Sequence, residues 1–242
     1  MTLAEILQSL FPQGHRLNLA NGLVYGCATR ATGGSIQVIG VTNGVALGVD
    51  DAVTLSHHVL DVVARREREP IVVLVDSSSQ RMSKRDELLG LNEFLAHLAK
   101  CLIYADSCGH PTVGVLYGNT AAGAFLATAL AARTLAALPG AHPEVMDLPS
   151  IARVTKLPME VLELKAKSNP VFAPGLENLA QTGAVHEIWD PAIPLAGQLE
   201  SAIAAQAAHN GDIRDQLGLQ RRGRLKAADI SARVYQLATE AL

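Results

Sequence analysis

Hydrophobic positions along the chain alternate between the spacing of a helix and the continuous apolar run of a buried strand. Residues 71–75 read IVVLV, a composition expected for a strand that is covered on both faces of a sheet. Residues 48–69 and 88–106 have apolar positions at helical spacing, and 112–118 (TVGVLYG) predicts the next strand. Because helices separate these strands, the pattern predicts parallel pairing through crossover connections in an α/β fold.

Shorter elements flank this central alternation. The first 16 residues predict an amphipathic helix, and two β-rich runs, GLVYGCATR and SIQVIGVT, are separated by ATGG, a hairpin signal. An Ala-rich helix is expected from about Ala121 to Ala132, and the chain turns mostly helical from about Pro149. No repeat or linker interrupts the chain, so we expect a single domain over residues 1–242 with a helical C-terminal extension at about 191–242.

Bulk composition limits the classes of partner. The 242 residues are 49% hydrophobic, so the core is large and part of the apolar excess is available for an interface between subunits. The formal net charge of −3 shows no basic excess, and nucleic acid is therefore not expected as a partner. No apolar run is long enough to predict a membrane span. Three cysteines at no metal-like spacing predict free thiols in a reducing compartment, so we expect a cytoplasmic protein without a metal site.

The stretch from Gly118 to Ala124 (GNTAAGA) is made of small residues and joins a strand to a helix. Small residues at such a junction allow close packing, and Ala is the best helix former. They also let a ligand oxygen approach the N–H groups of the first helical turn, which have no acceptor inside the helix. Fixed donors of this kind stabilise an oxyanion. The residues alone leave both interpretations open.

Two familiar uses of a strand–turn–helix do not fit this stretch. A phosphate-binding P-loop needs a Lys after its second Gly, and residues 113–133 contain no Lys. A nucleophile elbow needs a Ser between two glycines, and no Ser occurs from residue 108 to 149. A serine peptidase of the Clp type, which has a related architecture, is therefore not expected.

The order of elements over residues 71–102 and 111–146 resembles the crotonase-fold carboxyltransferase superfamily, and within it the gamma subunits of biotin-independent malonate decarboxylase. The resemblance covers essentially the whole chain, including GLENLAQTGAVHEIWD and the C-terminal helices. It implies a crotonase-like β-β-α superhelix of the ClpP/crotonase type.

The resemblance also implies where the active site lies. In that family the turn carries Gly-Gly-Ala or Gly-Gly-Ser, and its backbone amides form one oxyanion hole. The matching residues here are Ala122, Gly123 and Ala124, so Ala122 replaces the first Gly. The departure narrows the space for a ligand but removes no donor, because every residue except Pro has an N–H group. The donors are expected within Ala121–Ala124.

A divided active site is a further implication of the family. The homologous beta subunit would supply the other oxyanion hole, and further decarboxylase subunits would complete the assembly. The substrate would be a malonyl thioester on the phosphopantetheine-type, CoA-like prosthetic group of an acyl carrier protein, and the products CO2 and the acetyl thioester. No biotin or other cofactor bound by this chain is implied. The chemistry agrees, because an enolate needs placed donors rather than a metal or a nucleophile.

Other polar residues near the ends of the predicted strands are weaker candidates. The segment DSSSQR (76–81) follows a buried strand at its C-terminal end, where α/β folds place ligands. It either contributes to the acyl pocket or is a solvated loop in which Asp76 caps a turn, and we favour the loop. Contact with substrate and turn formation stay equally open for residues 119–120. The candidate substrate-binding residues are Ser78, Ser79, Gln80, Arg81, Asn119 and Thr120.

The basic run RRGR, Arg221–Arg224, has two interpretations. Arginines attract the phosphates of a carrier prosthetic group. More often a short basic run is a solvated face or the rim of a subunit interface, and we favour that interpretation.

Two other functions stay open at this point. A stand-alone acyl-CoA hydratase or isomerase of the same superfamily usually needs a carboxylate near the α-carbon of the thioester, and residues 113–133 contain no Asp or Glu. A non-catalytic scaffold that only stabilises the beta subunit is the other alternative. Such a scaffold would tolerate bulky residues at 119–124, whereas this chain has small ones there.

Overall fold

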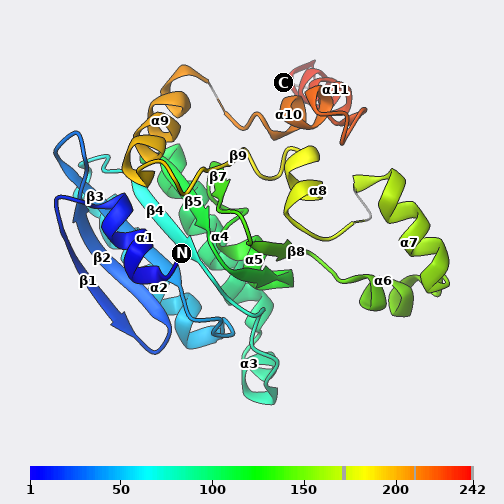
Figure 1. Cartoon of the computed structure of the whole chain (residues 1–242), viewed down its shortest axis with the longest axis horizontal. Helices are drawn as coiled ribbons and strands as arrows, with labels where there is room; N and C mark the ends of the chain where they lie inside the picture. Colours follow the sequence, from blue (N-terminus) through cyan, green and yellow to red (C-terminus); the bar gives the residue numbers. More distant parts are fainter. Residues whose placement is uncertain (171–172, 210, 241–242) are drawn as a thin grey trace.

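A computed structural model describes residues 1–170, 173–209 and 211–240, and its centre is a twisted sheet (Figure 1). Within the described chain the sheet has seven strands in the order β1-β2-β3-β4-β5-β7-β9. The pairings β1–β2 and β2–β3 are antiparallel, and all pairings from β3 to β9 are parallel. The strands are β1 (His15–Ala20), β2 (Leu23–Thr29), β3 (Ser35–Val41), β4 (Ile71–Val75), β5 (Thr112–Leu116), β7 (Thr134–Ala137) and β9 (Glu187–Ile188).

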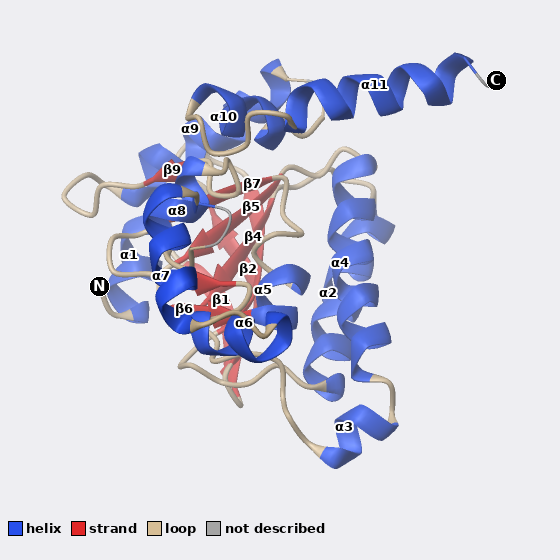
Figure 2. Cartoon of the chain, turned by 90° about the vertical axis from the view of Figure 1, so that its right-hand side faces the viewer, coloured by secondary structure: helices blue, strands red, loops and turns tan. Residues whose placement is uncertain are grey.

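Helices cover both faces of this sheet. Figure 2 shows α2 (Val49–Arg65) and α4 (Leu91–Ser107) on one side and α1 (Leu3–Leu10) on the other. Successive side chains of a strand point to opposite faces. Val73 of β4 accordingly packs in the core below α2 and α4, and its neighbour Leu74 packs in the core below α1 and α9 (Leu195–Ala208). The buried run of β4 predicted from the sequence is confirmed.

A second, two-stranded sheet lies outside the main one. Its strands β6 (Asn119–Ala121) and β8 (His142–Glu144) pair in parallel, with Ala121 opposite Glu144. The helix α5 (Ala122–Ala127) follows β6 without a linker. The stretch of small residues is therefore a strand–helix junction, as the sequence predicted, but it begins on a short strand of its own.

The helix expected from about Ala121 to Ala132 is shorter than predicted, because α5 ends at Ala127. The hydroxyl of Thr128 donates to the Ala124 carbonyl at 2.6 Å, and residues 128–133 form turns and bends. Carbonyls of these turns, at Leu130, Ala132 and Arg133, accept hydrogen bonds from the Arg214 guanidinium. A side chain distant in sequence thus satisfies backbone groups that a longer helix would have paired internally.

The remaining helices lie at the periphery of the described structure. The pair α6–α7 lies beside the sheet in Figure 1, and α11 projects from the body in Figure 2. No helix in the described ranges combines the length and the apolar composition needed to cross a membrane. Their bounds are α3 (Lys84–Leu88), α6 (Leu148–Thr155), α7 (Met159–Ser168), α8 (Leu176–Gln181), α10 (Arg214–Gln220) and α11 (Ala227–Glu240).

Candidate functional site

The loop after β4 and the turn after β5 lie side by side at the carboxyl ends of the strands. The Asp76 Oδ1 atom accepts from the Asn119 N–H at 3.1 Å, and the Ser77 N–H donates to the Asn119 carbonyl at 2.7 Å. The hydroxyls of Ser77 and Thr120 are 3.0 Å apart in the interior. Gly118 is required here, since a Cβ at this residue would lie 2.1 Å from the Asp76 carboxylate. Asp76 therefore caps the turn that leads to α5.

The bend from β6 into α5 falls on Ala122, whose φ angle is +49°. This left-handed conformation costs a residue with a Cβ about 1–2 kcal/mol. Glycine adopts it freely. The family resemblance leads one to expect Gly at this position, as the first residue of the Gly-Gly-Ala motif. The strain at Ala122 gives a physical reason for that Gly, because Gly would adopt the same conformation without it. The same bend presents the first turn of α5, with Ala121, Ala122 and Gly123 half-buried and Ala124 fully buried.

Ala122→Gly is expected to stabilise the chain by about 0.5–1 kcal/mol, since relief of the left-handed strain exceeds the added freedom of the unfolded chain. Urea unfolding of the two purified proteins measures the difference. Ala124→Gly is the matched control, because Ala124 is a buried residue inside α5 and its replacement should destabilise by about 1 kcal/mol or more. A loss of about 0.5–1 kcal/mol in the Ala122→Gly protein, the cost of Gly where no strain is relieved, would show that the bend carries no strain.

One donor of the first turn of α5 already has an acceptor in this structure. The Gly123 N–H donates to the Gln80 side-chain oxygen Oε1 at 2.9 Å. A Cβ on Gly123 would lie 3.0 Å from Leu95 Cδ1 and 3.3 Å from that oxygen, so a side chain would crowd the position. An amide oxygen from outside the helix can thus reach the Gly123 N–H, and the spot it occupies is one that another carbonyl or enolate oxygen could take.

The backbone on either side of Gln80 is held by the segment that precedes α2. The Leu47 N–H donates to the Ser79 carbonyl at 2.9 Å, and the Arg81 N–H donates to the Leu47 carbonyl at 2.8 Å. The Arg81 guanidinium pairs with Asp51 at 2.5 Å. Asp51 in turn accepts from the Gly48 N–H at the start of α2. The loop is therefore anchored, which differs from the solvated loop that the sequence favoured, whereas the turn cap by Asp76 in that interpretation is confirmed.

A buried carboxylate strengthens this anchoring. Asp86, which is 1% exposed, accepts from the Ser83 hydroxyl at 2.5 Å and from the Val49 N–H at 3.0 Å. These hydrogen bonds lower the pKa of Asp86 below its usual value, with the Ser83 hydroxyl the larger cause. An ionised Asp86 at the N-terminus of α2 fixes the loop that carries Gln80. The acidic pair Asp50–Asp51 at the start of the helix expected over 48–69 is a signal for the N-terminal role of Asp51. The pairing of Asp51 with Arg81 and the contact of Asp86 with α2 were not predicted, and no spacing in the sequence signals the role of Asp86.

The other candidate residues are placed differently. Ser78 and Asn119 are exposed, and the half-buried Ser79 donates its hydroxyl to the Gln80 carbonyl at 2.9 Å. Thr120 is 1% exposed and its hydroxyl faces Ser77, so its side chain lies in the interior. Gln80 is thus the candidate that the structure brings into contact with the expected donors.

The basic run after α10 binds main-chain oxygens. Arg221 donates to the carbonyls of Ala180, Val185 and His186 at 2.6–2.8 Å. Arg224 donates to the carbonyls of Thr182 at 2.8 Å and Arg214 at 2.9 Å. These two arginines therefore tie α10 to the turn after α8, which differs from a solvated face. A place for the run at the rim of a subunit interface stays a prediction.

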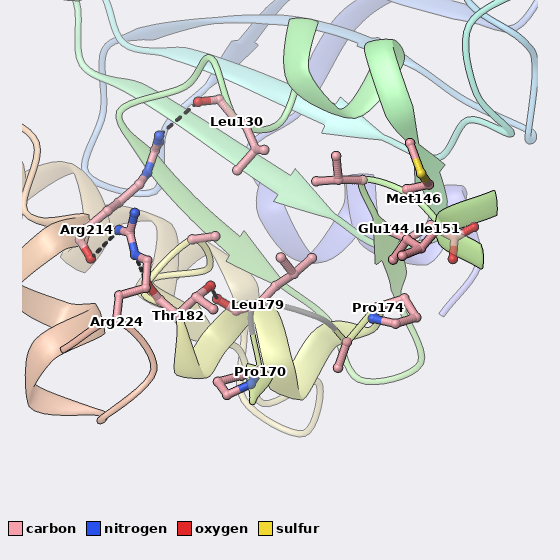
Figure 3. A pocket seen from close by; sticks show the side chains of 13 residues that line it. Leu130, Glu144, Met146, Ile151, Pro170, Pro174, Leu179, Thr182, Arg214 and Arg224 are labelled. Carbon is pink, nitrogen blue, oxygen red and sulfur yellow. Dashed lines mark hydrogen bonds between the residues drawn. The ribbon is translucent and has the colours of Figure 1, made fainter. Parts of the chain in front are cut away.

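A largely apolar cavity of about 460 Å³ lies beside β8 (Figure 3). Glu144, which pairs with Ala121 in the small sheet, lines one end, and Arg214 and Arg224 line the other. The described lining does not include residues 121–124. Residues 121–123 consequently lie on a half-buried surface next to the cavity rather than inside it, and Ala124 lies in the interior. Among the residues that the structure describes, no cluster of three or more His, Cys, Asp or Glu side chains is placed to hold a metal ion.

Comparison with known protein families gives one match over most of the chain. The malonate decarboxylase gamma subunit family (MdcE) matches residues 42–238. A curated relative, the malonyl-S-ACP:biotin-protein carboxyltransferase MADD of Malonomonas rubra, is 32% identical in an alignment 178 residues long that covers 69% of this chain. The aligned part spans 61% of the length of that relative.

Solved structures with the same architecture come from related assemblies. A Pseudomonas malonate decarboxylase hetero-tetramer in complex with coenzyme A contains a chain that is 26% identical, with a TM-score of 0.78 and 98% of both chains covered. The Pseudomonas MdcD–MdcE hetero-dimer gives 25% identity and a TM-score of 0.74, again over 98% of both chains. Transcarboxylase 12S, at 19% identity, a TM-score of 0.69 and coverage of 86% of this chain and 41% of its own, shares the fold. The crotonase-like α/β fold expected from the sequence is confirmed.

Proposed function

The chain belongs to the malonate decarboxylase gamma subunit family, and we propose that it forms one half of an active site that decarboxylates a malonyl thioester. The homologous beta subunit supplies the other half. The substrate is carried by an acyl carrier protein through a phosphopantetheine-type prosthetic group, and further decarboxylase subunits complete the assembly. A bound biotin is not needed in this scheme. The cytoplasmic location expected from the cysteine content stays a prediction.

The reaction requires hydrogen-bond donors from this chain. The bond between the α-carbon and the carboxylate of the malonyl group breaks, CO2 leaves, and the electron pair passes through the α-carbon to the thioester oxygen as an enolate. A proton from water then completes the acetyl group. N–H groups fixed where the charge develops lower the barrier, and one such donor is worth roughly 3–4 kcal/mol. The proposed donors are backbone N–H groups within Ala121–Ala124.

The observation that carries the proposal is the hydrogen bond from the Gly123 N–H to the Gln80 Oε1 atom at 2.9 Å. It supports the proposal because a neutral carbonyl-type oxygen, the same kind of atom as a thioester oxygen, sits on a donor of the expected turn. The substrate oxygen would replace the Gln80 oxygen there. The half-buried position of the donors also supports a site that is completed by a second subunit.

Replacing Gln80 with a charged isostere gives a direct readout of that exchange. Gln80→Glu places a carboxylate oxygen where the substrate oxygen must bind, and its competition and repulsion should cost on the order of 1–2 kcal/mol, a rise in KM of about tenfold. Gln80→Ala removes the same amide without adding charge, and it serves as the matched control. Steady-state kinetics of the assembled enzyme on malonyl carrier protein should show the larger KM for Gln80→Glu. Equal kinetic constants for the two variants would contradict the exchange.

Carboxyl transfer to a biotin protein is the second candidate function, because the Malonomonas rubra relative bears that description. The two functions differ in where the carboxyl group goes. Labelled malonyl carrier protein is incubated with the assembled subunits, with and without a biotin carrier protein. Release of labelled CO2 without the biotin protein is the expected result. Label that is retained until biotin protein is added, and that avidin then captures, would establish carboxyl transfer instead.

A further inference from the structure

A second cavity, of about 310 Å³, lies at the end of the main sheet away from the donor turn at 121–124. Its lining includes Thr134, the first residue of β7, and Glu187 at the start of β9. The donor turn instead follows the carboxyl end of β5, which runs parallel to β7. The two regions therefore lie at opposite edges of the sheet, and the proposed decarboxylation does not use this cavity. Its volume is in the range of small-molecule sites, about 300–1,000 Å³.

One buried acceptor in the wall of this cavity has no partner in the described structure. Gln206 of α9, which is 7% exposed, uses both hydrogens of its side-chain amide. They are donated to the Thr112 carbonyl at 2.8 Å and to the Thr134 hydroxyl oxygen at 2.9 Å. These two bonds fix the orientation of the amide and leave its Oε1 atom buried without a hydrogen bond. Because an unpaired buried acceptor is costly, this atom requires a group with a proton to donate.

Two donors line the same cavity. The ring of His186, which is 9% exposed, accepts from the Leu135 N–H through Nδ1 at 3.1 Å. Burial, followed by the positive charge of Arg214, lowers the pKa of His186 to about 4, so the ring is neutral and carries its single proton on Nε2. No described residue accepts a hydrogen bond from that nitrogen. The Thr134 hydroxyl accepts from the Gln206 amide, so its own proton is also available.

The wall of the cavity carries a net positive charge. Arg133 and Arg221 both line it, and Glu187 is the one acidic residue in its described lining. Asp106, outside the wall, lies 3.6 Å from the Arg133 guanidinium and offsets its charge. The Arg221 guanidinium is held by neutral main-chain carbonyls, which leave its charge in place. The cavity therefore favours a ligand with an anionic group near Arg221.

We propose that this cavity binds a small carboxylate that carries a hydroxyl group on the neighbouring carbon. The carboxylate oxygens accept from the His186 Nε2–H and from the Thr134 hydroxyl, and the charge of Arg221 attracts them. The hydroxyl of the ligand donates to the Gln206 Oε1 atom. A simple carboxylate would leave that acceptor unpaired, and an uncharged hydroxy amide would lose the attraction of the arginine. The bound molecule would join α9 to β7 and to the start of β9, so it should also stabilise the fold.

Three ligands of similar shape test the proposal on the unaltered full chain. Lactate has both groups, propionate lacks the hydroxyl, and lactamide lacks the charge. Calorimetric titration should show saturable binding of lactate, with dissociation constants at least about tenfold higher for the other two, because each lacks one of the paired groups. The midpoint of thermal unfolding should rise with lactate concentration. Equal affinity for propionate or lactamide would overturn the proposal. Absence of saturable lactate binding up to about 100 mM would assign the cavity to water and overturn it as well.

His186→Asn tests the location of the site. The Asn side-chain oxygen can still accept from the Leu135 N–H, whereas the Nε2 donor is lost, so lactate should bind at least about tenfold more weakly. His57→Asn is the matched control, since His57 is exposed on α2 and does not line the cavity, and its lactate affinity should equal that of the parent chain. Unchanged binding by the His186→Asn chain, or an equal loss in the control, would overturn the proposal. Circular dichroism verifies the fold of both variants, and the ligand series on the parent chain decides alone if one of them does not fold.

Discussion

Gly123→Val is expected to lower turnover of the assembled decarboxylase by at least about a hundredfold, the size of effect seen when a donor of an oxyanion site is lost. The substitution keeps the N–H group but fills the space in front of it. Even a single Cβ would lie 3.0 Å from Leu95 Cδ1 and 3.3 Å from Gln80 Oε1. The two methyl groups of Val extend further, into the position where the substrate oxygen must bind. Rates of CO2 release from malonyl carrier protein measure the effect.

A matched glycine controls for nonspecific effects of the new side chain. Gly197 in α9 is exposed, and a Cβ there would meet no atom within 4 Å. Gly197→Val should leave turnover unchanged, and both variants should still bind the beta subunit, as size-exclusion chromatography can verify. Normal turnover of Gly123→Val in an intact complex would favour the non-catalytic scaffold over the proposed half-site.

The central architecture could be predicted from local patterns. The continuous apolar run at 71–75 predicts that β4 is a strand covered on both faces. Its adjacent residues Val73 and Leu74 do pack into the cores on opposite faces of the sheet. The hairpin between β2 and β3 was also expected from ATGG. These features depend on residues close together in sequence, where periodicity and turn composition carry the information.

Features set by contacts distant in sequence were missed. Strand β1 was missed although Leu17 and Leu19 alternate with polar residues, and its exposed or half-exposed side chains are ordered by pairing with β2. The length of α5 is set by the Thr128 hydroxyl and by Arg214, which binds carbonyls more than 80 residues earlier.

The candidate site was predicted in part. Both the small-residue turn and the loop after β4 follow predicted strands, but the hydrogen bonds that join them at the carboxyl ends of the strands were not predicted. The hydrogen bond between Gly123 and Gln80 joins residues 43 positions apart, and the anchoring of Arg81 by Asp51 joins residues 30 apart. No spacing rule predicts such contacts, because they depend on how two loops pack. The roles of the donors within Ala121–Ala124 stay a prediction.

The second large expected effect follows from the division of the site between two subunits. Each subunit alone would hold only one set of donors, and a water-exposed donor gives far less stabilisation than one in an enclosed site. We therefore expect this chain alone to release CO2 from malonyl carrier protein at no more than about a thousandth of the rate of the assembled pair, a difference of about 4 kcal/mol. The beta subunit alone should be equally inactive.

The most direct test of this account titrates one purified subunit against a fixed amount of the other while CO2 release is measured. The account predicts that either subunit alone releases CO2 at no more than about a thousandth of the paired rate, and that the rate rises with added partner in parallel with the formation of the complex. Full release of CO2 by this chain in the absence of any partner would contradict it.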